Sequence, residues 1–135
     1  MTRAAFAIAI DHDRRLVALR FSGFWDASDF ASFRETFNHQ SARVPWRGGH
    51  LAMVDLSECA IQSRDVFAGL RDMIEREPRK PRRFALVGGE GLARLQFRRM
   101  VVRDDIRLFD TRVAAEQWLF ASKTNEGEVA PQVTA

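Results

Sequence analysis

Residues 50–76, HLAMVDLSECAIQSRDVFAGLRDMIER, contain the pattern on which the fold prediction depends. The apolar run at residues 51–54 ends on the carboxylate of Asp55, which is typical of a short buried strand. Ser63 then opens a segment with apolar residues at helical spacing, namely Val66, Phe67, Leu70, Met73 and Ile74. The pattern predicts a strand, an amphipathic helix, and between them a polar loop that carries Asp55, Ser57, Glu58, Cys59 and Ser63.

Four more apolar runs, at residues 6–10, 16–21, 84–87 and 106–109, predict the remaining strands. The polar turn at residues 11–15 joins the first two in what we expect to be an antiparallel hairpin. The run at 84–87 is apolar throughout, as expected of a strand that is buried on both faces in a parallel sheet.

Three further helices are expected. The first follows the second strand, with Asp26 or Ser28 as its N-cap and with Phe30, Phe33 and Phe37 on its buried face. The next covers about residues 92–103, with an apolar side made of Leu92, Leu95 or Gln96, and Met100. The last begins at Asp110 or Thr111 and buries Ala114, Ala115, Trp118 and Leu119.

The resulting order, β-β-α-β-α-β-α-β-α, predicts one α/β domain over residues 1–121 with a mixed, mostly parallel sheet. Crossovers between parallel strands are right-handed, so steps in one direction along the sheet place the helices mainly on one face. Residues 122–135 are polar and contain a proline, and we expect a disordered tail there.

Length and composition indicate a globular protein with a single core. A chain of 135 residues can bury a single core, and 46% hydrophobic with 29% charged residues is ordinary for a globular protein. No apolar run approaches the roughly 20 residues that span a bilayer, so we expect no membrane partner. The single cysteine, Cys59, excludes an internal disulfide and fits a reducing, cytoplasmic location.

No catalytic constellation is visible in the sequence. The histidines at 12, 39 and 50 lack metal-ligand spacing, and residues 88–91, GGEG, lack the pattern of a phosphate-binding loop. Cys59 is predicted to be a small buried side chain, although Arg64 would lower its pKa if it lay close. We therefore expect no enzymatic activity, no cofactor and no metal.

Three segments carry a family resemblance: residues 53–57 (MVDLS), residues 84–89 leading into 92–96, and residues 107–111 followed by Ala115 and Trp118-Leu119. In this order they resemble the STAS superfamily, which comprises the anti-sigma-factor antagonists and the SpoIIAA-like (STAS/SEC14) group of small bacterial proteins. The resemblance covers about residues 4–121. It implies a non-catalytic regulatory module that binds a protein partner or a small ligand at the loop after the third strand.

The antagonist branch of that superfamily is switched by phosphorylation of a serine in an Asp-Ser-Ser segment. Aligned without gaps from Asp55, that segment falls on Ser63-Arg64-Asp65, so Arg64 occupies the position of the phosphoacceptor. We therefore expect no phosphorylation switch at Ser63, which is better explained as a helix N-cap. Asp55 either ties down the loop or acts as a working carboxylate. The candidate binding residues are Asp55, Ser57, Glu58, Ser63 and Arg64.

Basic residues crowd the segment 79–107, which suggests an alternative function. Its members are Arg79, Lys80, Arg82, Arg83, Arg94, Arg98, Arg99, Arg103 and Arg107. Pairing with Glu75, Glu77, Asp104 or Asp105 would explain them. The alternative is a surface that binds nucleic acid or another anionic partner, although only Phe84 and Phe97 could supply base stacking.

A homodimer is also expected. Both faces of the predicted N-terminal hairpin carry apolar residues, and helices mainly on one side would leave the other face uncovered. An exposed apolar patch on a monomer usually marks an interface.

Overall fold

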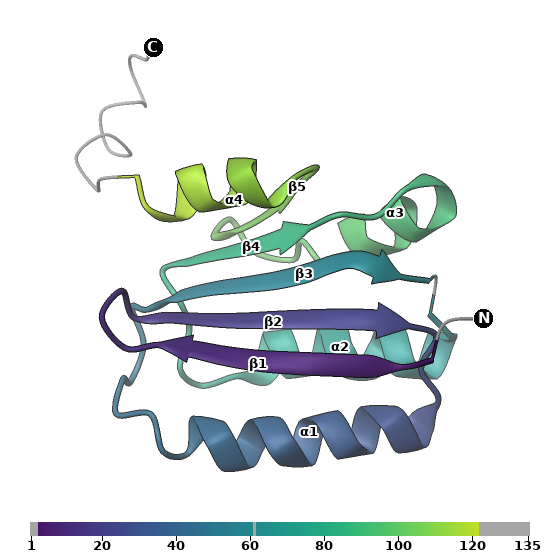
Figure 1. Cartoon of the computed structure of the whole chain (residues 1–135), viewed down its shortest axis with the longest axis horizontal. Helices are drawn as coiled ribbons and strands as arrows, with labels where there is room; N and C mark the ends of the chain where they lie inside the picture. Colours follow the sequence, from purple (N-terminus) through teal and green to yellow (C-terminus); the bar gives the residue numbers. More distant parts are fainter. Residues whose placement is uncertain (1–2, 61, 122–135) are drawn as a thin grey trace.

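The computed structural model describes residues 3–60 and 62–121 (Figure 1). The predicted tail at 122–135 lies outside the described residues. In chain order the elements are β1 (Ala5–Asp11), β2 (Leu16–Gly23), α1 (Ala27–Ser41), β3 (Leu51–Cys59), α2 (Arg64–Arg76), β4 (Arg83–Val87), α3 (Gly91–Arg98), β5 (Ile106–Phe109) and α4 (Arg112–Leu119). The predicted order and α/β class are confirmed.

The five strands lie in the sheet in their sequence order, β1-β2-β3-β4-β5. Strands β1 and β2 form the expected antiparallel hairpin, and the other neighbouring pairs are parallel. Every residue of β4 is buried, as predicted for an apolar run at the centre of a parallel sheet.

The residues that cap the N-termini of α1, α2 and α4 are among those predicted from the sequence. Asp26, not Ser28, caps α1 in a reciprocal capping box with Asp29. The Ser63 hydroxyl accepts a hydrogen bond from the Val66 amide at the start of α2. Thr111, not Asp110, does the same for the Ala114 amide at α4. Each cap satisfies an amide that the helix itself leaves unpaired.

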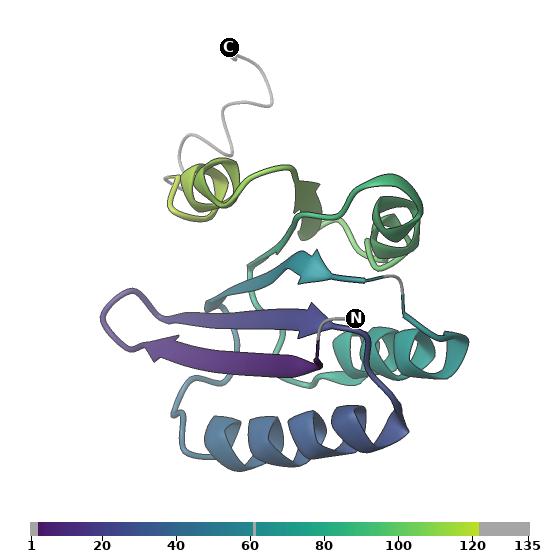
Figure 2. The same ribbon diagram turned by 45° about the vertical axis from the view of Figure 1, so that its right-hand side comes forward.

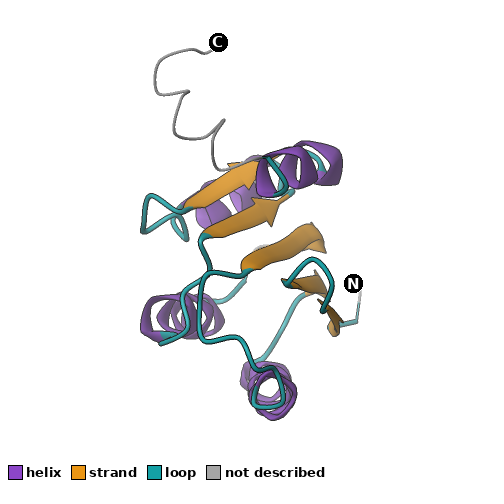
Figure 3. Cartoon of the chain, turned by 90° about the vertical axis from the view of Figure 1, so that its left-hand side faces the viewer, coloured by secondary structure: helices purple, strands orange, loops and turns teal. Residues whose placement is uncertain are grey.

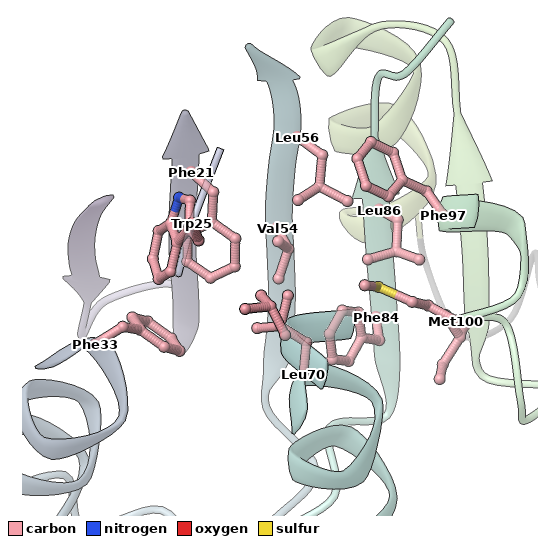
Figure 4. Close-up of a cluster of buried hydrophobic side chains, with 12 residues drawn as sticks. Phe21, Trp25, Phe33, Val54, Leu56, Leu70, Phe84, Leu86, Phe97 and Met100 are labelled. Carbon is pink, nitrogen blue, oxygen red and sulfur yellow. The ribbon is translucent and has the colours of Figure 1, made fainter. Parts of the chain in front are cut away.

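Two apolar clusters hold the layers together. The larger one packs α1, α2 and α3 onto one sheet face and is centred on Phe33, Val54, Leu70, Leu86 and Phe97 (Figure 4). The smaller one joins the opposite face to α4, through Leu16, Leu51, Met53, Ala85, Val87, Ala115 and Leu119. Three helices thus share one face, as predicted, but α4 lies on the other (Figure 3). No strand follows α4, so the crossover rule does not constrain it.

Helix α3 differs from its prediction in length and in orientation. It ends at Arg98 rather than Arg103, and Leu92 and Leu95, expected inside, are 70% and 54% exposed. Phe97 is fully buried instead. The chain turns after Arg98, which brings Met100 into the core from outside the helix and removes the need for an apolar side at 92 and 95.

Strand β3 is longer than predicted. It continues past Asp55 to Cys59 because β2 also continues, and Ser22 and Gly23 pair with Glu58 and Cys59 after a register shift. Asp55, Ser57 and Glu58 therefore belong to a strand and not to a loop. Only the short connection to Ser63 remains between β3 and α2.

A candidate partner surface at the carboxyl ends of the strands

The Asp55 carboxylate organises the end of β3. Its Oδ1 accepts hydrogen bonds from the Ser57 amide at 2.9 Å and from the Ser57 hydroxyl at 2.6 Å. Its Oδ2 lies 3.8 Å from a guanidinium nitrogen of Arg112, at the start of α4. With its side chain only 14% exposed, Asp55 lies inside β3 and contacts α4, whereas the sequence analysis expected it to end the strand and tie down the following loop.

The neighbouring βα turn fits against the same place. Gly88 has φ +99°, and a Cβ there would lie 2.6 Å from the Ser57 Cα. The close approach of two backbones and the positive φ both require glycine. The turn is also held by Arg94, which pairs with Asp110 at 2.8 Å. The GGEG segment is thus a tight turn, as expected.

Glu58 contacts the neighbouring strand β2 and not α4. Its carboxylate oxygens lie 3.3 Å from the guanidinium of Arg20 on β2, and both side chains are more than half exposed. Exposed ion pairs contribute little to stability, about 0–1 kcal/mol. This pair therefore remains available for contacts with a second molecule.

Gln62 fixes the connection between β3 and α2, a role that the sequence analysis missed. Its buried side chain accepts a hydrogen bond from the Trp25 amide at 2.9 Å and donates to the carbonyls of Gly23 and Ala60. Its backbone exchanges two further hydrogen bonds with the side chain of Gln96 on α3. A buried, fully bonded amide of this kind holds three segments in one arrangement.

Ser63 and Arg64 follow directly and begin α2. The Ser63 hydroxyl is used as the N-cap, and Arg64 is exposed. Within residues 3–60 and 62–121, no hydrogen bond or ion pair joins Ser63 or Arg64 to Asp55, Ser57 or Glu58. The five candidate residues therefore share one edge of the sheet but do not form one cluster.

Cys59 is a half-buried thiol without activation. Burial is the largest cause that raises its pKa, to about 12, and the charge of Asp55 adds to the effect. Arg64, which would lower this pKa if it lay close, is not among the groups that shift it. A thiol that stays protonated at neutral pH is a poor nucleophile.

Several basic residues of the segment 79–107 are used within the fold. Arg83 is buried and donates to the carbonyls of Leu119 and Ala121 at the end of α4. Arg79 donates to the Ser41 carbonyl, and Arg103 pairs with Asp105.

In the described part of the chain, no group of three or more His, Cys, Asp or Glu side chains could hold a metal ion. No helix there is long and apolar enough to cross a membrane.

Comparison with known proteins identifies the fold. No protein-family model and no curated protein matches the sequence. Among solved structures, an uncharacterized protein from the DUF3478 family of Shewanella loihica PV-4, with a SpoIIAA-like fold, matches with a TM-score of 0.65. The match covers 88% of this chain and 97% of that chain at 18% identity.

A second match is an anti-sigma factor antagonist from Mycobacterium paratuberculosis, with a TM-score of 0.57. It covers 87% of this chain and 96% of that chain at 13% identity. The architecture is therefore that of the SpoIIAA-like fold, as expected from the resemblance of the three sequence segments.

Proposed function

We propose that this chain is a non-catalytic, cytoplasmic regulatory module that binds a protein partner at the junction of β3 and α2. The contact surface would be centred on Arg64 and include Ser63 and the exposed pair Arg20–Glu58. The observation that carries the proposal is the bonding of Gln62, which ties the residue before Ser63 to the end of β2, to Trp25 and to α3, while Arg64 is exposed. A preorganised surface loses little entropy on binding.

Site-specific photocrosslinking in the native host tests the location. A benzophenone amino acid at position 64 should give one discrete crosslinked protein, because the side chain would lie inside the interface. The matched control is position 43, an exposed arginine at the opposite end of the strands, which should give none. Equal crosslinking from both positions, or none from 64, would contradict the proposal.

We expect no phosphorylation at Ser63 in the native host. Arg64 occupies the usual acceptor position and cannot carry a phosphoryl group, while the Ser63 hydroxyl already caps α2. Intact-mass and phosphopeptide analysis of the purified native protein should show only the unmodified chain. A substantial phosphorylated fraction at Ser63 would restore the switch.

The homodimer remains a proposal, now with a defined surface. Helix α4 packs on β3, β4 and β5 and leaves the β1–β2 hairpin open on that side (Figure 2). Ala5, Ala7 and Ala9 of β1 are exposed there, and Ala18 of β2 lies beside Ala9. The same face carries the exposed Arg20 beside Ala7, so a second copy would pack on the alanines of β1 and also contact Arg20.

Light scattering at micromolar concentration should therefore give twice the chain mass of 15.4 kDa. Ala7→Lys should convert the dimer to a monomer, because two buried lysines would face each other without partners. Ser32→Lys, an exposed position on α1, should leave the dimer intact. A parent protein that is already monomeric would refute the dimer.

The alternative function, binding of nucleic acid through residues 79–107, has less support because Arg79, Arg83 and Arg103 use their guanidinium groups internally. We expect no binding of labelled single- or double-stranded oligonucleotides at physiological salt. Saturable binding that weakens steeply as salt rises would instead favour this alternative.

A further inference from the structure

A cavity of about 120 Å³ lies between the sheet and helices α1 and α2, on the face away from α4. Its walls are almost entirely apolar and include Ile8, Val17, Phe37, Ala52, Leu70 and Met73. One water molecule needs only about 10–15 Å³ but also polar partners, and large apolar cavities stay dry and accept apolar guests. The space is therefore suited to hydrocarbon and not to solvent.

The polar members of the lining come from one end of the cavity. Gln40 and Ser41 end α1, His50 precedes β3, and Glu77 and Arg79 follow α2. The side chains of Glu77 and Arg79 are each 29% exposed, whereas Leu56 and Leu86, which line the far end, are buried. The cavity thus opens at the amino ends of the parallel strands, opposite the Arg64 surface.

His50 supplies an unused polar atom at this opening. Its Nδ1 is buried and has no hydrogen-bond partner among the described residues. Burial, followed by the charge of Arg79, lowers the pKa of the imidazole, so the ring is neutral at pH 7 and can donate one proton. A buried polar atom without a partner is costly, and a ligand oxygen would satisfy it.

The charge around the opening favours an anion. Of the charges that act on His50, Arg79 and Glu77 pair with each other at 3.6 Å, which leaves Arg15 as the net positive charge. Along α2 the lining runs from Leu70 to Glu77, which corresponds to about 10 Å of helix. A slender chain of this length with an anionic end matches both the apolar depth and the polar mouth.

We propose that the cavity binds a single-chain, medium-length aliphatic carboxylate, with its tail between α1 and α2 and its carboxylate at His50, beside Arg15. The proposal is independent of the partner surface, because the two sites lie at opposite ends of the strands. It adds a small-molecule ligand, bound at a different place, to the protein partner proposed above.

Calorimetric titration of the full chain with hexanoate, octanoate, decanoate and dodecanoate tests the tail. Affinity should rise about fourfold with each added methylene until the cavity is full, and then stop rising. Ala52→Phe, which fills the space from β3, should abolish binding. Ala68→Phe, on the exposed side of α2, is the matched control and should bind like the parent.

His50→Phe tests the head, and should weaken octanoate binding about tenfold or more by removing a hydrogen bond to a charged group. Methyl octanoate, with the same tail and no charge, should bind more weakly than octanoate to the parent. Should Ala52→Phe not fold by circular dichroism, Ala52→Met serves as a smaller filler with the same expected direction.

Three results would overturn the proposal. They are the absence of saturable binding for all four acids, unchanged affinity in a folded cavity-filling variant, and equal affinity for the acid and its methyl ester. If the Ala52→Phe variant loses octanoate binding but still gives the crosslinked protein at position 64, the cavity proposal is supported and the partner surface is shown to be independent of it.

Discussion

Replacing Phe33 by alanine is expected to lower the free energy of unfolding by about 3–5 kcal/mol, the usual range for a buried Phe. Phe33 is 1% exposed, and its ring contacts those of Phe6, Phe21, Trp25 and Phe37 at centroid distances of 4.8–5.8 Å. The contacts with Phe6, Phe21 and Trp25 are edge-to-face and add to the energy of burial. The lost ring would leave a void that its neighbours do not fill.

Urea denaturation followed by circular dichroism measures this effect. The midpoint should fall sharply, with an unchanged dependence on denaturant. Phe24→Ala is the matched control because Phe24 is 39% exposed, and it should cost less than about 1 kcal/mol. Similar midpoints for the two variants would show that the aromatic cluster does not hold α1 to the sheet.

Trp118→Ala is expected to cost about 3 kcal/mol, near the lower end of the range for a buried aromatic. The sequence analysis placed Trp118 in the core, but it is only partly buried. Its ring packs on Phe109 at 5.5 Å and lies under the guanidinium groups of Arg83 and Arg107. Removing the ring loses these contacts and loosens α4, whose first turn holds Asp55 through Arg112.

Val113→Ala provides the comparison on the same helix, since Val113 is 65% exposed. It should change the free energy of unfolding by less than about 0.5 kcal/mol. If Trp118→Ala is as stable as the parent, the second apolar cluster does not anchor α4 as described.

The order of elements could be predicted because each segment carries a local signal. The apolar run of β4, the Phe30-Phe33-Phe37 row and the caps at Asp26 and Ser63 all depend on residues close in sequence. The placement of α4 could not be predicted this way. It depends on Ala115 and Leu119 meeting Met53 and Ala85 across the sheet, which are contacts distant in sequence.

The candidate residues lie at the carboxyl end of β3 and the start of α2, as the sequence pattern predicted, but the contacts among them were not foreseen. Whether β3 ended at Asp55 or continued to Cys59 depended on the length of β2 and on a register shift, neither of which leaves a local pattern. Gln62 and Gln96 were missed for a similar reason: a glutamine gives no sign in sequence that its amide is buried among backbone partners.

The cavity was also beyond sequence reasoning. Residues such as Ala52, Leu70 and Met73 were correctly assigned to the buried faces, but periodicity reports only which side of an element is apolar. Whether two apolar faces close completely depends on side-chain volumes from several elements at once.

The central claim is that the Arg64 surface binds a partner without a phosphorylation switch, and one affinity comparison tests it most directly. Using the protein captured by the crosslinker at position 64, we would measure its Kd for the parent, Ser63→Asp and Arg64→Glu. Aspartate keeps the N-cap of α2 and adds the negative charge of a phosphorylated serine.

We predict that Ser63→Asp binds within about twofold of the parent, whereas Arg64→Glu weakens binding at least about tenfold by reversing a charge at the interface. Loss of binding in Ser63→Asp, with Arg64→Glu unaffected, would contradict the account and show that this fold operates here as a phosphorylation switch.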